Sequence, residues 1–157
     1  LSGLLNLRGL TESVRLLCQE GVAQSAYLLY CDLDHLKQIN DYFGHPEGNY
    51  AIATCSSILR ECIRGADKLA RVGGDEFVCL VLSGNPTFPD LFRARLSAAC
   101  ERVNQTSGKP YYIGLSVGIQ PFTLSSYEDF HRAVAEADKK LYISKRDRRS
   151  DVRRETE

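Results

Sequence analysis

The sequence lacks an excess of charge of either sign, because Lys plus Arg and Asp plus Glu each number 20. Proteins that bind duplex DNA or an anionic membrane surface typically carry a net positive charge, so we expect neither nucleic acid nor direct membrane contact. A long hydrophobic run is also missing, since the stretch around "AYLLYC" is far shorter than the roughly 20 apolar residues that span a bilayer. The composition, 43% hydrophobic and 25% charged, is that of a globular protein.

The chain has no initiator methionine, and its first residues, "LSGLLNLRGL", show neither the basic start nor the cleavage site of a signal peptide. A length of 157 residues suits one domain and is too short for two. We therefore expect residues 1–157 to form a single domain cut from a longer protein. Its expected location is the cytoplasm, even where the parent protein is membrane-bound.

Six cysteines are present, yet no pair has the Cys-x-x-Cys spacing of redox and metal motifs. They could form three disulfides, or they could be reduced core residues of a cytosolic protein. Most of them fall at apolar helix or strand positions, which favours the second interpretation.

Hydrophobic periodicity predicts a regular series of helices and strands. The predicted order is a helix around Leu10–Cys18, a buried strand at 25–34, helices at 35–43 and 47–63, strands at 68–72 and 77–82, a helix through Phe92–Val103, a strand at 111–120 packed closely on one face, and a helix through Phe130–Leu141. A hairpin combined with crossover connections indicates an α+β fold with a palm-like antiparallel or mixed sheet flanked by helices.

The stretch "RVGGDEF" places two adjacent acids in the turn of the predicted hairpin. We expect Gly73 and Gly74 to supply the positive φ angles of a tight turn and to let a phosphate approach the backbone. Adjacent carboxylates repel each other and any phosphate unless a cation lies between them, so Asp75 and Glu76 indicate a divalent metal. Magnesium prefers such oxygen ligands.

Asp32 and Asp34 leave the end of the buried strand, where they can either cap the next helix or bind Mg²⁺. We expect the chain to turn Asp34 away, so that Asp32 alone faces the site. Basic side chains should meet the far phosphates of a nucleoside triphosphate, and the candidates are Lys37, Lys145 and Arg149, the last two sharing a helix face.

Five blocks in this order resemble the GGDEF family, the diguanylate cyclases that condense two GTP molecules into cyclic di-GMP. The blocks are "LSGLLNLRGL", "DLDHLKQINDYFGHPEGN", "RVGGDEF", "LSVGI" and "ADKKLYISK", which together cover essentially the whole chain. The resemblance implies a palm-like fold with the GGDEF hairpin at the active site and two Mg²⁺ or Mn²⁺ ions in each site. It also implies that two domains, each holding one GTP, face each other as a homodimer controlled by an attached sensor.

The resemblance also assigns roles to the matching positions. Asp32, the backbone carbonyl of Leu33, Asp75 and Glu76 would bind metal, with Asp32, Asp75 and Glu76 catalytic and Glu76 nearest the reacting 3′-hydroxyl. Gly73 and Gly74 would lie against the nucleotide, Asn40 would contact guanine, and Lys37, Lys145 and Arg149 would hold the β- and γ-phosphates. Arg64 and Asp67 match the inhibitory product-binding motif, with Arg95 as a second arginine, whereas without the resemblance they read as a salt bridge at a helix end.

Asn49 departs from the family pattern, which has an Asp at the position that accepts from guanine. An amide offers one acceptor there and complements adenine better, at a cost of roughly 1–3 kcal/mol in guanine recognition. One hypothesis is weaker or less selective GTP binding with some acceptance of ATP, and the alternative is that Asn49 rotates and keeps one guanine contact. An active cyclase is favoured over a non-enzymatic GTP or cyclic di-GMP receptor, because the signature acids are intact.

Overall fold

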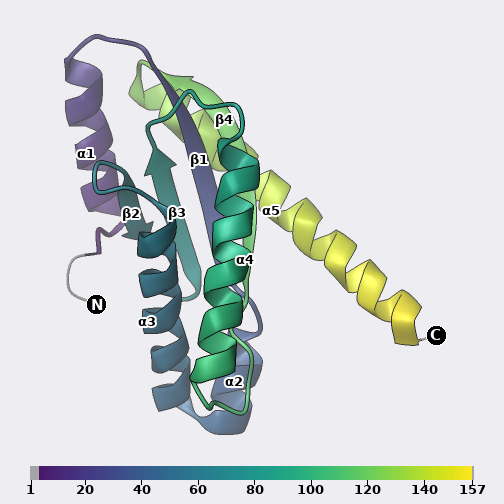
Figure 1. The fold of residues 1–157 in the computed structure, drawn as a ribbon. Helices are drawn as coiled ribbons and strands as arrows, with labels where there is room; N and C mark the ends of the chain where they lie inside the picture. The colour runs from purple at the N-terminus through teal and green to yellow at the C-terminus, as the bar shows by residue number, and fades with distance from the viewer. Residues whose placement is uncertain (1–3, 157) are drawn as a thin grey trace.

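The computed structural model describes residues 4–156 and, of these, the side chains of residues 4–146. Figure 1 shows how its helices and strands are arranged in space. The elements are α1 (Leu7–Gln19), β1 (Gln24–Leu33), α2 (Leu36–Phe43), α3 (His45–Cys62), β2 (Lys68–Arg71), β3 (Glu76–Val81), α4 (Phe88–Thr106), β4 (Leu115–Leu124) and α5 (Tyr127–Thr156).

The strands form one 4-stranded sheet in the order β2-β3-β1-β4. Every neighbouring pair is antiparallel, with β1 between β3 and β4. The predicted α+β fold is therefore confirmed, and its sheet is antiparallel rather than mixed. Because β1 is central, most of its residues are buried, as its apolar sequence predicts.

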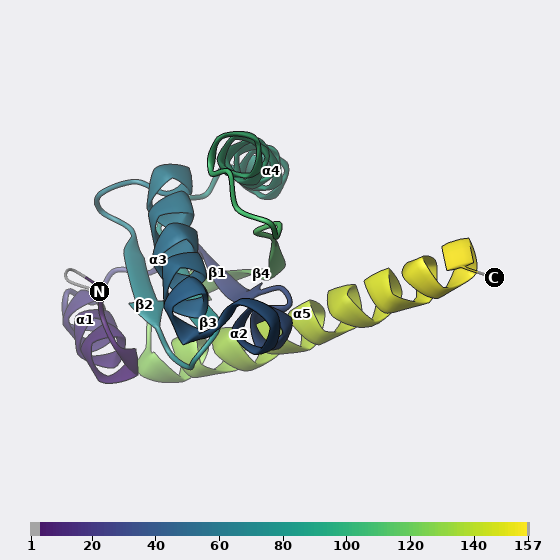
Figure 2. The same ribbon diagram turned by 90° about the horizontal axis from the view of Figure 1, so that it is seen from below.

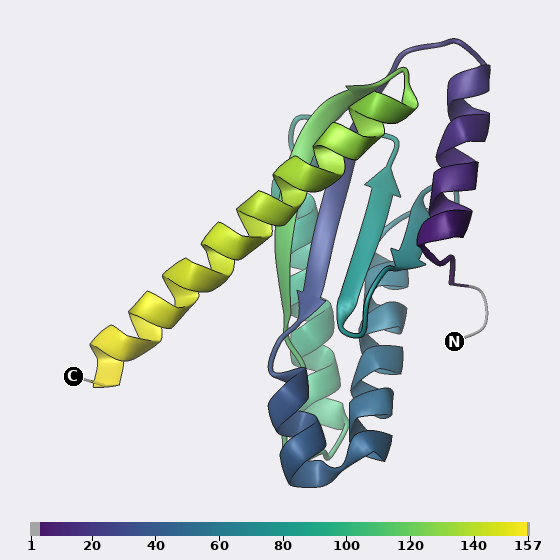
Figure 3. The ribbon, with the colours of Figure 1, turned by 180° about the vertical axis from the view of Figure 1, so that it is seen from behind.

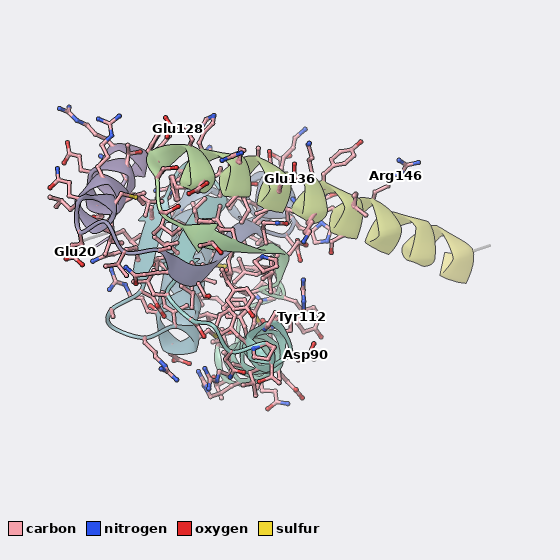
Figure 4. All side chains as sticks on the ribbon, turned by 90° about the horizontal axis from the view of Figure 1, so that it is seen from above. Glu20, Asp90, Tyr112, Glu128, Glu136 and Arg146 are labelled. Atoms are coloured by element: carbon pink, nitrogen blue, oxygen red, sulfur yellow. The ribbon has the colours of Figure 1, made fainter. Side chains whose placement is uncertain are left out.

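Helices cover both faces of the sheet, as the view along it shows (Figure 2). One hydrophobic cluster joins the sheet to α3 and α4, and a second joins the opposite face to α1 and α5. Charged side chains, including Glu128, Glu136 and Arg146, project from the outer side of α5 (Figure 4). The two clusters fix the strands between helical layers and leave the strand ends to carry the site.

Helix α5 lies on β4 at very close range, as predicted for the late strand. A Cβ atom on Gly118 would be 2.1 Å from the carbonyl oxygen of Ala137 and 2.5 Å from the backbone nitrogen of Leu141. The helix crosses the sheet obliquely and continues beyond its edge (Figure 3). This contact sets where the later residues of α5, including Lys145, pass the end of β1.

Several predicted boundaries differ from the structure, most by a single residue, and the larger differences are in α3, in β4 and at the end of α5, which runs on to Thr156. Helix α3 begins at His45 rather than at Glu47, because Pro46 occupies its first turn, where a proline is tolerated. Strand β4 begins at Leu115 and runs on to Leu124. Pro121 is accommodated in β4 because this is an edge strand, whose outward positions need no N–H donor.

The six cysteines are free, and burial raises the pKa of the thiols of Cys55 and Cys100. The expectation of reduced core cysteines is confirmed for four that are buried, whereas Cys18 and Cys100 are half-buried. Among the described residues, no helix has the length and apolar character that crossing a membrane requires.

Candidate metal and nucleotide site

Three carboxylates lie close together where β1 ends and β3 begins. Asp32 of β1 pairs directly with Glu76 of β3 in the antiparallel register, so the two side chains lie on the same face of the sheet. Asp75 precedes Glu76 in the turn, and its carbonyl oxygen accepts a hydrogen bond of 2.9 Å from the backbone nitrogen of Leu33. The ligand atoms of the three acids lie within 4.8 Å of one another, as a metal site requires.

The turn between β2 and β3 is held by the backbone and by one arginine. The amide of Val72 donates to the carbonyl of Glu76 at 3.0 Å. The guanidinium of Arg71 donates to the carbonyls of Gly73 and Gly74, at 3.2 and 2.8 Å. These bonds use backbone oxygens of the turn and do not involve the Asp75 and Glu76 carboxylates.

The expectation that Gly73 and Gly74 adopt positive φ angles is wrong. Neither residue has a φ in the left-handed range, which among the described glycines is found at Gly21, Gly44 and Gly108. Residues 72–75 form a turn long enough to reverse the chain in ordinary backbone conformations. Gly73 instead leaves room for the Glu76 side chain, because a Cβ on Gly73 would lie 3.1 Å from Oε2 of Glu76. The space beside Gly74 is open.

Asp32 is the buried member of the cluster. Its Oδ2 contacts Nζ of Lys145 from α5, while its buried Oδ1 has no hydrogen-bond donor. Burial raises the pKa of Asp32 to about 6, Lys145 opposes this rise, and the neighbouring Asp75 carboxylate adds to it. Oδ1 of Asp32 is buried without a hydrogen-bond donor, and two further carboxylates lie beside it. A divalent cation would compensate this negative charge, so these residues fit a metal site.

Asp34 points away from this cluster, as predicted. Its Oδ1 accepts a hydrogen bond of 2.6 Å from Oγ of Ser116. Neither Asp32 nor Asp34 caps the next helix. The N-cap residue of α2 is His35, and no side chain forms a capping hydrogen bond there. Asp32 alone of the pair enters the site.

The predicted phosphate-binding cations are only partly brought together. Lys145 reaches the cluster, as its contact with Asp32 shows. Lys37 is exposed on α2, and the side chain of Arg149 lies outside the described side chains. Their roles toward phosphate stay predictions.

The predicted base-reading residues lie at the junction of α2 and α3, where Gly44 turns the chain with a φ of 92°. The Asn40 carboxamide packs over Gly48, since a Cβ there would be 1.7 Å from its Oδ1. Asn49 follows Gly48 directly and is exposed. Glu47 anchors this turn by accepting from Nζ of Lys109 at 2.9 Å and from the hydroxyl of Tyr111 at 2.5 Å.

Two of the three predicted inhibitory residues, Arg64 and Asp67, help to line a cavity of about 330 Å³ with Arg60 and Lys68, whereas Arg95 lies on α4. Asp67 accepts from the backbone nitrogens of Arg64, at 2.8 Å, and of Leu82, at 3.1 Å. Its carboxylate thus ties the end of α3 to the end of β3. Arg64 and Arg95 are exposed, and product binding there stays a prediction.

Two residues of the site were not predicted from the sequence. Arg71 holds the turn, and its position two residues before Gly73 was the available signal. The hydroxyl of Tyr30 donates to Oε2 of Glu76 at 2.9 Å. Burial first, and then the Glu76 hydrogen bond and charge, raise the pKa of Tyr30, so its hydroxyl stays protonated.

The fold and the site define a palm-like α+β domain with a carboxylate cluster at the end of its central strands. Residues 1–151 match the family model described as diguanylate cyclase, GGDEF domain. The chain belongs to this GGDEF-domain family.

Curated relatives and solved structures agree with this assignment. The chain is 31% identical over 152 residues to a probable diguanylate cyclase, DgcJ, of Escherichia coli, covering 96% of this chain and 29% of that protein. It is 30% identical to diguanylate cyclase A of Treponema denticola, over 80% of this chain and 34% of that protein. The chain thus spans about a third of the length of these two relatives.

Among solved structures, diguanylate cyclase SiaD of Pseudomonas aeruginosa, in complex with its activator SiaC, superposes with a TM-score of 0.79 at 26% identity. The match covers 93% of this chain and 56% of that one. The GGDEF domain of DgcB from Caulobacter crescentus, in complex with c-di-GMP, has a TM-score of 0.73 at 24% identity, over 91% and 86% of the two chains. The second likeness bears on the fold alone.

Proposed function

We propose that this domain is a diguanylate cyclase that condenses two GTP molecules into cyclic di-GMP and two pyrophosphates. The observation that carries the proposal is the buried Asp32, whose Oδ1 has no donor and whose neighbours are Asp75 and Glu76. Asp32, Asp75 and Glu76 would together hold a divalent cation, whose charge would offset the repulsion among the three carboxylates. Family membership supplies the substrate class.

The proposed metal ligands are Asp32, the Leu33 carbonyl, Asp75 and Glu76, for two Mg²⁺ or Mn²⁺ ions. Bound there, such ions would supply the positive charge that activates a 3′-oxygen as nucleophile and offsets the negative charge at the α-phosphate while pyrophosphate leaves. The residues of the chain orient the reactants. Glu76 faces the 3′-hydroxyl, and the bare backbone of Gly73 and Gly74 lies against the phosphates.

The remaining groups bind the nucleotide. Asn40 contacts the guanine, and Lys37, Lys145 and Arg149 hold the β- and γ-phosphates. The contact of Lys145 with Asp32 supports this role, because the ammonium group already lies beside the carboxylates. It can turn to a phosphate once another cation neutralises Asp32.

Each domain holds one GTP, so two domains must face each other for both bonds to form. The active species is therefore a homodimer, and an attached sensor domain controls its formation. Product binds at Arg64, Asp67 and Arg95 and inhibits the enzyme, with the Arg60 and Lys68 charges beside that cavity supporting an anionic ligand.

The test of the enzyme proposal is pyrophosphate release from GTP with Mg²⁺, for the wild type and for Glu76→Ala. The proposal expects a loss of at least about 100-fold in the variant, because removing a metal ligand in the reacting centre removes transition-state stabilisation. Glu61→Ala is the matched control, since Glu61 is an exposed glutamate that pairs with Arg102 far from the turn. Equal rates for wild type and Glu76→Ala would favour the rival function, a receptor that binds GTP or cyclic di-GMP without turnover.

Asn49 supports a second candidate, a cyclase of relaxed base specificity. Asn49 is exposed next to the Asn40–Gly48 contact, where a base would be read. Labelled GTP and ATP, supplied separately and mixed, should then give mixed cyclic dinucleotides, and Asn49→Asp should raise the preference for GTP by about 10-fold. Cyclic di-GMP as the sole product at unchanged efficiency in both proteins would rule this candidate out.

A further inference from the structure

Tyr30 is the feature of the site for which the family resemblance assigned no role. It lies two residues before Asp32 on β1, so strand alternation places it on the same face as Asp32 and Glu76. Its hydroxyl donates to Oε2 of Glu76 at 2.9 Å. Its ring packs, partly buried, against the hydrophobic cluster beneath α1 and α5.

The surroundings of Glu76 leave one carboxylate oxygen for other partners. Oε2 lies between the Tyr30 hydroxyl and the bare Cα of Gly73, whose missing Cβ would stand 3.1 Å from it. Glutamate has three rotatable side-chain bonds, so an unanchored carboxylate at a strand end samples many orientations. The Tyr30 hydrogen bond selects one of them through Oε2 and leaves Oε1 available to a cation held by the three neighbouring carboxylates.

We propose that Tyr30 is a positioning residue, which holds the Glu76 carboxylate in the orientation that binds the divalent cation. The metal-binding part of this inference rests on the site alone, and the kinetic part rests on the proposed cyclase function. The arrangement is that of an outer partner that orients a metal ligand through its second oxygen, where loss of the partner typically costs about 10-fold or more in metal affinity or activity.

Tyr27 provides a matched control on the same strand. Its hydroxyl donates to the Asn85 carbonyl at 2.6 Å, and its ring packs on Phe88, on the opposite face of the sheet and nearer the start of β1. Tyr27→Phe therefore loses one tyrosine hydrogen bond without touching the carboxylates. Tyr30→Phe also loses one tyrosine hydrogen bond, and its loss releases the Glu76 carboxylate from its fixed orientation.

The experiment compares wild type, Tyr30→Phe and Tyr27→Phe in the full chain. Mn²⁺ binding without nucleotide is measured by the loss of the free-ion electron paramagnetic resonance signal, and kcat and KM for GTP are measured separately. Tyr30→Phe should raise the Kd for Mn²⁺ by about 10-fold and lower kcat by about 10-fold, with KM for GTP within about 2-fold of wild type. Tyr27→Phe should match wild type in all three quantities.

A double variant tests whether Tyr30 acts through Glu76. In a Glu76→Gln background, Tyr30→Phe should cause little further loss of Mn²⁺ affinity, because the ligand that it orients is already impaired. The same loss in both backgrounds would overturn the proposal, and so would wild-type Mn²⁺ affinity in Tyr30→Phe. If Tyr30→Phe binds Mn²⁺ more weakly than wild type but the wild type makes no product from GTP, the proposed function is rejected. The positioning role of Tyr30 is then still supported.

Discussion

At the scale of single residues, Asp32 destabilises the metal-free fold. Its side chain is 12% exposed, and its pKa rises from 3.8 to about 6 in the folded protein. Because the folded-state pKa is the higher one, the proton binds more tightly to the folded state. This contribution to stability is fully present below about pH 4 and is lost as the pH rises through 6.

Asp32→Asn should therefore stabilise the metal-free domain at pH 7.5, by up to about 3 kcal/mol in the free energy of unfolding. Lys145, which loses its partner, is 30% exposed and can turn to water. Urea unfolding at pH 7.5 and pH 4 measures the effect, which should vanish at the lower pH. Asp90→Asn, an exposed position on α4, is the control.

The same pair of proteins separates stability from metal binding. Mg²⁺ should raise the melting temperature of the wild type and have little effect on Asp32→Asn, since the variant lacks the buried ligand. A variant less stable than wild type at pH 7.5 would mean that the Lys145 contact outweighs the burial of the charge.

Some residues of the site could be predicted from the sequence, and others could not. Asp32, Asp75 and Glu76 were predictable because strand ends and turns place acids in recognisable patterns. Tyr30 was not, because its hydroxyl meets Glu76 only through the register that pairs Asp32 with Glu76 across β1 and β3. The φ angles of Gly73 and Gly74 were predicted wrongly. The sequence alone does not reveal whether a glycine is present because its φ angle is positive or because a neighbouring side chain leaves no room for a Cβ atom.

At the scale of elements, the turn between β2 and β3 makes unequal use of its two glycines. A methyl group on Gly73 would press on the Glu76 carboxylate, whereas the space beside Gly74 is open. Gly73→Ala should therefore weaken Mn²⁺ binding in the nucleotide-free protein by about 10-fold, and Gly74→Ala should leave it within about 2-fold of wild type. Isothermal titration calorimetry on both variants checks this, and equal losses would show that flexibility rather than space is what the turn needs.

The contact of β4 with α5 is a second element-scale feature with a measurable cost. Gly118→Ala should destabilise the domain by about 1–3 kcal/mol, because its methyl group would have to displace the α5 backbone at Ala137 and Leu141. Gly65→Ala, where the added atom meets nothing within 4 Å, is the control. Thermal unfolding of the two variants measures the difference, and similar melting temperatures would contradict so close a contact.

The order and type of the elements followed from hydrophobic periodicity, because each helix buries one face and β1 is buried on both. The start of α3 was misplaced because Pro46, a residue that usually interrupts helices, is accepted in a first turn. The full length of β4 was missed because Pro121 suits an edge strand, and the edge position is known only once the strand order is.

At the scale of the whole molecule, the site is one half of the proposed reaction centre. The cluster lies at the end of the central strands, on the face that α5 crosses (Figure 3). In the proposed reaction a second domain brings its own GTP to this face, so the rate per domain should rise with protein concentration and level off once dimers predominate. A rate per domain that is independent of concentration across the monomer–dimer range would reject a two-domain reaction.

The most direct test of the account is the product formed from GTP and Mg²⁺ by the domain at high concentration. The account predicts cyclic di-GMP, with two pyrophosphates released per product molecule, and loss of both in Glu76→Ala. Binding of Mg²⁺ and GTP without pyrophosphate release, at concentrations where the domain is dimeric, would contradict it.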